Sequence, residues 1–431
     1  MISGTPVKRP RGSYASRLTA LRMLAGRDFR LLWLGQSVSI LGDQFYLVAL
    51  PWLVLYLTGS ALALGSVLLT ATVARVSFQL LGGAISDMVS QRKMMIVSSA
   101  VRAVVCATLS ALVLYHQIRL WHLFIIVAVF GMADAFFSPA LKAFIPVVVA
   151  KENLVGGNSV LNGSSLLAMF LGPSLAGFFI AVVGTGGAFV IDTCSFIFVM
   201  TCLFLMRGHA PSVIELELLT KRTTSTGTHL FRSIWEGLSY TWREPTLRAL
   251  LLITAMVEFA FAGPFTVGLA ALANIKFAGG ATAFGAMLSA LGGGLLIGTL
   301  VVNSMHARFS FEKTILWLTS GLGIGLTLLG LVPNVIWACV LMVLIGMIAG
   351  YTQVLVATWL QTKSDPHMRG RVMSVVMLGA YGLTPLSYVL TGALTQHFSV
   401  SFMFRVIGIV LVISLAFCRF PAAPTEAQPP S

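Results

Sequence analysis

The chain has 431 residues, of which 57% are hydrophobic and only 10% are charged, and its formal net charge is +14. Such a composition excludes a soluble globular protein, because so much exposed apolar surface would cause aggregation. The apolar runs are about twice the roughly ten residues of a membrane β-strand and do not alternate, so we predict membrane-spanning helices.

Apolar windows separated by polar breaks predict where these helices lie. A helix needs about 20 apolar residues to cross a hydrocarbon core of about 30 Å. The predicted spans are 30–57, 61–85, 94–115, 121–148, 158–183, 187–206, 247–274, 280–305, 314–332, 335–360, 371–397 and 400–419. The prediction is therefore an all-α membrane protein with twelve transmembrane helices.

The twelve spans fall into two groups of six. Gly131-Met132 corresponds to Gly346-Met347, and Pro173 corresponds to Pro385, which indicates a duplicated six-helix unit. A site between two such halves can face one side of the membrane and then the other. The predicted parts are a basic tail at 1–29, a bundle at 30–206, a linker at 207–246, a bundle at 247–420 and a tail at 421–431.

Basic residues predict the orientation. If both ends of the chain are cytoplasmic, the outer loops hold only Arg119 and Lys276, and the remaining loop bases face inward. We therefore expect a multi-pass protein of the cell inner (cytoplasmic) membrane with both termini in the cytoplasm. The positive charge follows from this topology and from attraction to anionic lipids, so it implies no nucleic-acid partner.

The sequence lacks the motifs of several other classes. Its five cysteines lie within apolar spans without metal-ligand spacing, and no phosphate-binding GxxxxGK[ST] occurs. We expect no metal, no cofactor and no enzymatic activity.

Several motifs resemble those of the major facilitator superfamily. The loop after the second span matches the superfamily loop motif at Gly83, Asp87 and Arg92 and departs from it at Met88 and Ser90. Further matches are Leu171 to Gly177, Arg369 to Ser374, and Arg27 to Asp43. Together they resemble the branch that contains macrolide, tetracycline and enterobactin exporters.

This resemblance implies the major facilitator fold and a latch on the cytoplasmic side. In the latch, Asp87 would accept hydrogen bonds near Gly370 and Arg371 at the start of the eleventh helix, with Gly83 and Arg92 completing the motif. The alternative for Asp87 is an ordinary solvated loop carboxylate. The fourth span lacks the arginine found in the other twelve-helix drug-exporter branch, so the proton relay of that branch cannot be transferred.

Two carboxyl groups inside the spans are candidate proton or substrate sites. An ionised Asp at a helix centre costs about 2.5–3.5 kcal/mol unless it has a partner or a wet cavity. Asp43 is a candidate proton carrier or cation anchor, and the alternative is a structural carboxylate hydrogen-bonded to a neighbouring helix. Glu258 lies between apolar neighbours that disfavour its charged form, so it can carry a proton; the alternative is a permanently protonated packing residue.

Other charged residues inside the spans are expected to be structural. Asp134 and Arg102 lie at comparable depths in adjacent spans, which predicts a buried ion pair, with substrate contact as the alternative. Arg75 and Asp192 are expected to be structural, and Arg405 to extend to the outer interface.

A hinge or seal between the halves is predicted at four residues. Proline removes a backbone hydrogen bond and permits a kink, and glycine allows helices to approach closely. The residues are Gly172, Pro173, Gly177 and Pro385.

The predicted function is secondary active transport. The chain would export an organic solute such as a drug, macrolide or siderophore in exchange for protons. Its partners would be that solute, protons and membrane lipids, and it would act as a monomer. The alternative is a lysophospholipid or other lipid transporter of the same fold, not coupled to protons.

Overall fold

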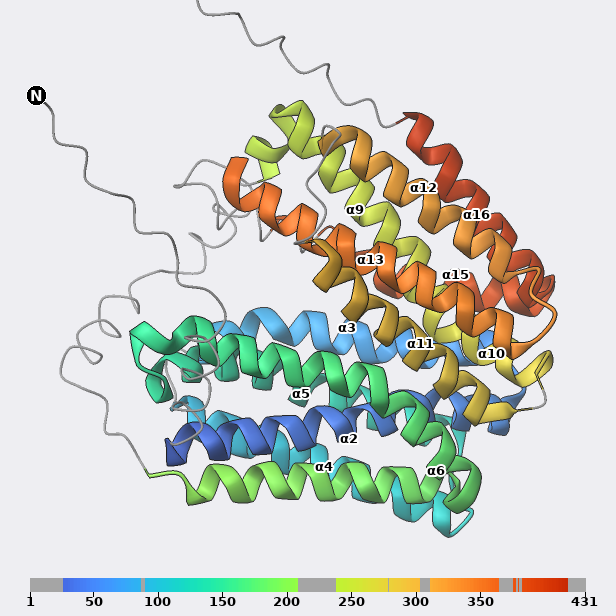
Figure 1. Ribbon diagram of the computed structural model, residues 1–431. Coiled ribbons are helices and arrows are strands. Elements are labelled where there is room, and N and C mark those ends of the chain that lie inside the picture. The colour runs from blue at the N-terminus through green and yellow to red at the C-terminus, as the bar shows by residue number, and fades with distance from the viewer. Residues whose placement is uncertain are drawn as a thin grey trace, which may run out of the picture.

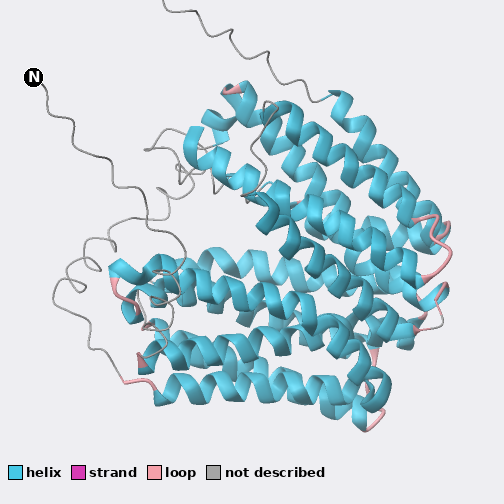
Figure 2. Ribbon diagram, viewed as in Figure 1, coloured by secondary structure: helices cyan, strands magenta, loops and turns pink. Residues whose placement is uncertain are grey.

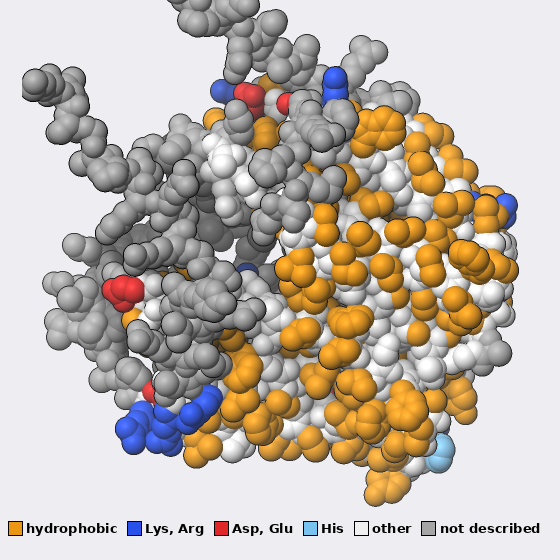
Figure 3. All heavy atoms as spheres, in the orientation of Figure 1, with side chains coloured by type: hydrophobic (Ala, Val, Ile, Leu, Met, Phe, Trp, Pro, Cys, Tyr) orange, Lys and Arg blue, Asp and Glu red, His pale blue; other side chains and the backbone are white. Residues whose placement is uncertain are grey.

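A computed structural model of the chain describes residues 26–86, 90–207, 238–277, 279–302, 311–363, 375–376, 379 and 382–417, without the side chains of 80–86, 151, 363 and 416–417. Within these residues the secondary structure is helical, and no strand occurs (Figure 2). This confirms the predicted all-α class. Hydrophobic side chains cover most of the face seen in Figure 3, and charged side chains gather near its edges.

The helices form two groups in chain order (Figure 1). The first group is α2 (Arg27–Thr58), α3 (Ala61–Ser86), α4 (Gln91–Leu114), α5 (Leu120–Val148), the short 3-10 helix η1 (Lys151–Asn153) and α6 (Leu154–Leu205). The second group is α9 (Pro245–Gly263), the π-helix η2 (Pro264–Gly268), α10 (Leu269–Ile275), α11 (Gly280–Val301), α12 (Phe311–Leu329), α13 (Val335–Lys363), α15 (Thr384–His397) and α16 (Val400–Phe417).

Eight helical stretches among the described residues are long and apolar enough to cross a membrane, and Val400–Leu415 is a shorter apolar helix. One of the eight, α6, contains two crossings joined at Gly184. This glycine has φ 83° and ψ 172°, outside the helical region, and it lies where the sequence predicts the break between spans 158–183 and 187–206. The helices are consistent with twelve crossings.

The two helix groups contact each other at one end and diverge toward the other, where α2 begins and α6 ends (Figure 1). At the packed end α3 lies against α15, and α6 lies against α11. A Cβ atom at Gly392 of α15 would come 2.6 Å from the carbonyl oxygen of Ala61, and one at Gly177 of α6 would come 2.6 Å from that of Ala281. Both contacts between the groups therefore depend on residues without a side chain.

The two groups repeat one packing arrangement. Gly131 of α5 faces the carbonyl of Ala71 on α3, and Gly346 of α13 faces the carbonyl of Leu291 on α11. In each case a Cβ atom would collide with the backbone of the neighbouring helix. The sequence correspondence between Gly131 and Gly346 thus reflects the same close helix approach in both groups.

The two prolines paired in the sequence have different positions in their helices. Pro173 lies inside α6, where it removes a helical hydrogen bond. Pro385 lies in the first turn of α15, where its missing N–H leaves no gap. A hinge at Pro385 stays a prediction.

Candidate functional site

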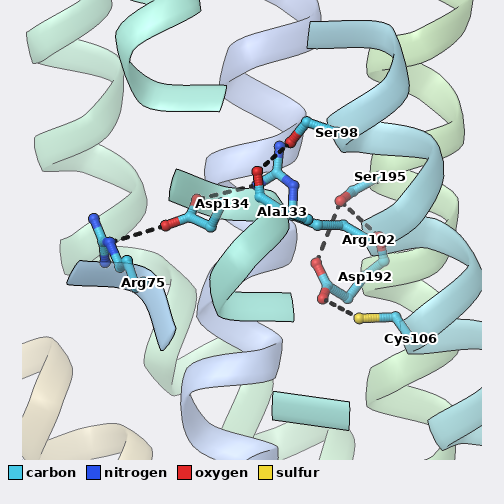
Figure 4. Close-up of polar contacts among 8 residues, drawn as sticks. All are labelled: Arg75, Ser98, Arg102, Cys106, Ala133, Asp134, Asp192 and Ser195. Carbon is cyan, nitrogen blue, oxygen red and sulfur yellow. Dashed lines mark hydrogen bonds and ion pairs between the residues drawn. The ribbon is translucent and has the colours of Figure 1, made fainter. Parts of the chain in front are cut away.

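Asp134 of α5 lies between two arginines from neighbouring helices (Figure 4). Its Oδ2 is 3.1 Å from Nε of Arg75 on α3, and its Oδ1 is 3.5 Å from Nη1 of Arg102 on α4. The predicted pair of Asp134 and Arg102 is present. Arg75 is a further partner. It was expected to be a structural charge inside its span, but its position beside Asp134 was not predicted.

Arg102 is only 2% exposed and lies among aromatic rings. Its guanidinium carbon is 4.3 Å from the ring centre of Phe137 and 4.5 Å from that of Phe196. Its Nε and Nη2 atoms have no hydrogen-bond partner among the described residues. The rings stabilise the cation, while two of its nitrogens remain available to a further acceptor.

Asp43 of α2 is half-buried and has neither a hydrogen bond nor an ion pair among the residues that the structure describes. It interacts electrostatically with Arg102, Asp134 and Arg75. Asp43 therefore belongs to the same charge cluster, without a bonded partner. The alternative interpretation is a carboxylate hydrogen-bonded to a neighbouring helix. No such bond to Asp43 occurs among the described residues.

Asp192 of α6 is a third carboxyl group in this cluster and is completely buried. The thiol of Cys106 donates to its Oδ2 at 3.3 Å, and the Ser195 hydroxyl lies 3.4 Å from its Oδ1 (Figure 4). Gly42 makes room for Ser195 and Asp192, because a Cβ atom there would collide with the Ser195 side chain and lie 2.9 Å from Oδ1 of Asp192. The sequence showed Asp192 as an intramembrane acid, but its position next to the turn that carries Asp43 was not predicted.

Glu258 of α9 lies in the other helix group, half-buried and without a hydrogen bond or ion pair in the described part of the chain. Tyr388 of α15 interacts electrostatically with both Glu258 and Arg75. The backbone of Tyr388 also packs against Gly65 of α3. Tyr388 is therefore within electrostatic range of the acid of one group and an arginine of the other, which no motif in the sequence indicated.

The predicted seal residues on α6 face different helices. Gly177 and Pro173 lie against α11, since Gly285 faces the carbonyl of Pro173. Gly172 instead faces the side chain of Gln44 on α2, within the first group. A role of these residues in opening and closing remains a prediction.

The predicted latch falls largely outside the described residues. Asp87, Gly370 and Arg371 are among those not described, and nothing is described around Gly83. Arg92 donates from Nε to the carbonyl of Leu203 at 2.8 Å and from Nη2 to that of Phe204 at 3.1 Å. It thus binds the last carbonyls of α6, as basic residues at helix C-termini do.

The helices, the glycine contacts between two helix groups and the charge cluster inside them define a multi-pass membrane transporter. A family model described as transmembrane secretion effector matches residues 18–430. The chain belongs to this family, which is part of the major facilitator superfamily, and it is a transporter and not an enzyme.

Among curated relatives, the multidrug efflux pump Tap of Mycolicibacterium fortuitum is 28% identical over 370 residues, covering 82% of this chain and 86% of the relative. The macrolide efflux protein A of Streptococcus pyogenes is 22% identical over 398 residues, covering 90% of this chain and 95% of the relative. Both relatives are named as efflux proteins, and the match covers most of each of them.

Solved structures share the fold at low sequence identity. A bacterial homologue of the iron transporter ferroportin in an inward-facing state has a TM-score of 0.68 at 16% identity, covering 91% of this chain and 98% of that one. The nucleoside transporter NupG has a TM-score of 0.69 at 12% identity, covering 91% of this chain and 98% of that one. Both confirm the predicted major facilitator fold.

Proposed function

We propose that this chain exports small organic compounds of the drug or macrolide class across the cytoplasmic membrane in exchange for protons. The substrate class comes from the relatives named as multidrug and macrolide efflux proteins. Membrane lipids surround the transporter, and a monomer contains both halves of the substrate path.

The main support for proton exchange comes from the surroundings of Asp43. It is a half-buried carboxyl group beside Arg102 and Asp134, and no described residue bonds to it. A proton carrier must be charged in one state and neutral in another, and an unpaired carboxyl group inside the membrane meets that requirement. Glu258 offers a second such group in the opposite helix group.

Alternating access is supported by the contacts between the two helix groups. They meet through Gly177 and Gly392 at one end and diverge at the end where α2 begins. With both chain termini in the cytoplasm, as the positive-inside rule favours, this conformation is open to the cytoplasm. A latch between Asp87 and Arg371 would then form only in the opposite, outward-open state.

The test is uptake of labelled macrolides and hydrophobic drugs into inverted membrane vesicles with an acidic interior. We expect accumulation that stops when nigericin collapses the pH gradient. Vesicles without the protein are the control for passive uptake. Uptake that nigericin leaves unchanged would contradict proton exchange, and absence of uptake for the whole panel would contradict the proposed substrate class.

A further inference from the structure

Asp192 lacks a cationic partner among the described residues. Its side chain is 0% exposed, and the donors that reach its oxygens are the thiol of Cys106 and the hydroxyl of Ser195, both of which are neutral. The Ser195 hydroxyl also has a shorter bond, of 2.8 Å, to the main-chain oxygen of Asp192. An ionised carboxylate in this position is strongly disfavoured.

The charged and titratable groups around Asp192 lie on helices α2, α4 and α5. They are Asp43 and Tyr46 on α2, Arg102 and Cys106 on α4, and Asp134 on α5, with Arg75 beyond Asp134. Both guanidinium groups already bind Asp134. Three carboxyl groups thus face two cations, so the cluster is neutral only when it holds one proton.

We propose that Asp192 is a proton-binding residue of the transport cycle and exchanges its proton through Asp43, the more exposed of the two carboxyl groups. The proposal rests on the proton exchange proposed above. Asp192 has no access of its own, whereas Asp43 is half-buried on the adjacent turn of α2. Gly42 lets the side chains of Ser195 and Asp192 lie against that turn, because a Cβ atom there would collide with the Ser195 side chain and come 2.9 Å from Oδ1 of Asp192.

Arg102 can stabilise the cluster after Asp192 has lost its proton. Its Nε and Nη2 are buried and have no hydrogen-bond partner among the described residues, and its charge acts on both Asp43 and Asp192. When the proton leaves, these two N–H donors can stabilise the resulting negative charge. When a proton returns, Arg102 keeps only its contact with Asp134.

Cys106 provides a direct spectroscopic test on the unaltered protein. A thiol S–H donor to a carboxylate forms a stronger hydrogen bond than one to a neutral acid, which lowers its stretching frequency. We expect an S–H infrared band that shifts between acidic and alkaline pH and on addition of a transported macrolide. Cys106→Ser should remove this band. A Cys106 band that neither pH nor substrate moves would overturn the proposal.

Asp192→Asn gives the second test, because it keeps size and an acceptor oxygen while removing titration. We expect loss of gradient-driven uptake in inverted vesicles, with substrate binding and melting temperature retained. Thr201→Ala on the same helix is the control, because the exposed Thr201 hydroxyl donates to the carbonyl of Ile197 within α6 and lies outside the cluster, and it should keep gradient-driven uptake. If Asp192→Asn transported like the parent protein, Asp192 would be a permanently protonated packing group. If uptake by the unaltered protein did not depend on the pH gradient, that result would contradict the proposed proton exchange itself, independently of Asp192.

Discussion

Ser387 of α15 accepts a hydrogen bond from the amide of Gly263 on α9, at 2.8 Å. The same hydroxyl donates to the carbonyl of Phe259 at 2.5 Å, so it stands in the position of a helical bond between Gly263 and Phe259. Pro264 follows at once and begins a π-helix. The course of α9 directly after Glu258 is therefore set by a side chain from another helix.

Ser387→Ala should reduce transport with little loss of stability. Without the hydroxyl, the Gly263 amide and the Phe259 carbonyl can bond to each other, so we expect a change of at most about 1–2 kcal/mol in unfolding free energy. Transport should fall because α9 straightens beside Glu258. Thermal unfolding in detergent and vesicle uptake measure the two effects.

Ser414→Ala on α16 is the matched control for this variant, since that hydroxyl bonds only to Leu411 of its own helix. It should leave uptake unchanged. Equal loss of uptake in both variants would show that the α9 bend has no special role.

Arg102 and Arg75 bind the same carboxylate but should differ in their contribution to stability. Arg102→Ala breaks a buried ion pair and removes a cation from between two rings, so we expect a loss of about 3–5 kcal/mol. The Arg75 side chain is 53% exposed, and Arg75→Ala should cost about 1 kcal/mol or less. Chemical unfolding of the two variants gives the order, and the reverse order would contradict this account of the cluster.

Asp43→Asn and Glu258→Gln should each abolish uptake driven by the pH gradient. An amide keeps the size and hydrogen bonding of the acid but cannot change protonation. At least one variant should still bind substrate or exchange it down its gradient. Binding and counterflow assays separate these outcomes, and full gradient coupling in both variants would remove the proposed proton carriers.

Gly177→Val should open the packed end between the two helix groups. A Cβ atom at Gly177 already meets the backbone of α11, so a larger side chain must separate α6 from α11, at a cost of about 1–3 kcal/mol. Spin labels at Gln117 and Leu331, in loops at this end, should show longer distances. Gly163→Ala on the same helix is the control, because its Cβ atom would meet nothing within 4 Å.

A cysteine at Lys276 tests the orientation. Lys276 is exposed at the end of α10, on the side predicted to face outward. A membrane-impermeant maleimide should label it in intact cells, while a cysteine at Arg243 should react only after permeabilisation. Labelling of Arg243 alone in intact cells would reverse the topology.

The sequence was sufficient to predict the helices and the Asp134–Arg102 pair. Apolar length is dictated by the bilayer, and two opposite charges at equal depth in adjacent helices have few other partners. The second partner of Asp134, Arg75, and the position of Asp192 could not be predicted, because both depend on the rotation of each helix about its axis. The same holds for Ser387 and Tyr388, whose contacts come from helices distant in sequence. The sequence could not distinguish the positions of Pro385 and Pro173, because a proline in the first turn of a helix and a proline inside a helix occur in similar residue patterns.

Gly184 joins the two crossings of α6 without a loop, and Ser110 of α4 holds the joint through the carbonyl of Gly186 at 2.9 Å. The first crossing carries Gly177, at the contact with α11, and the second carries Asp192. A flexible connection would let these crossings move separately. If the two halves rock as proposed, we expect a tilt of the first crossing to move the second crossing as well. A displacement at the contact with α11 would then change the surroundings of the buried Asp192, through the short connection at Gly184 and the hydrogen bond from Ser110.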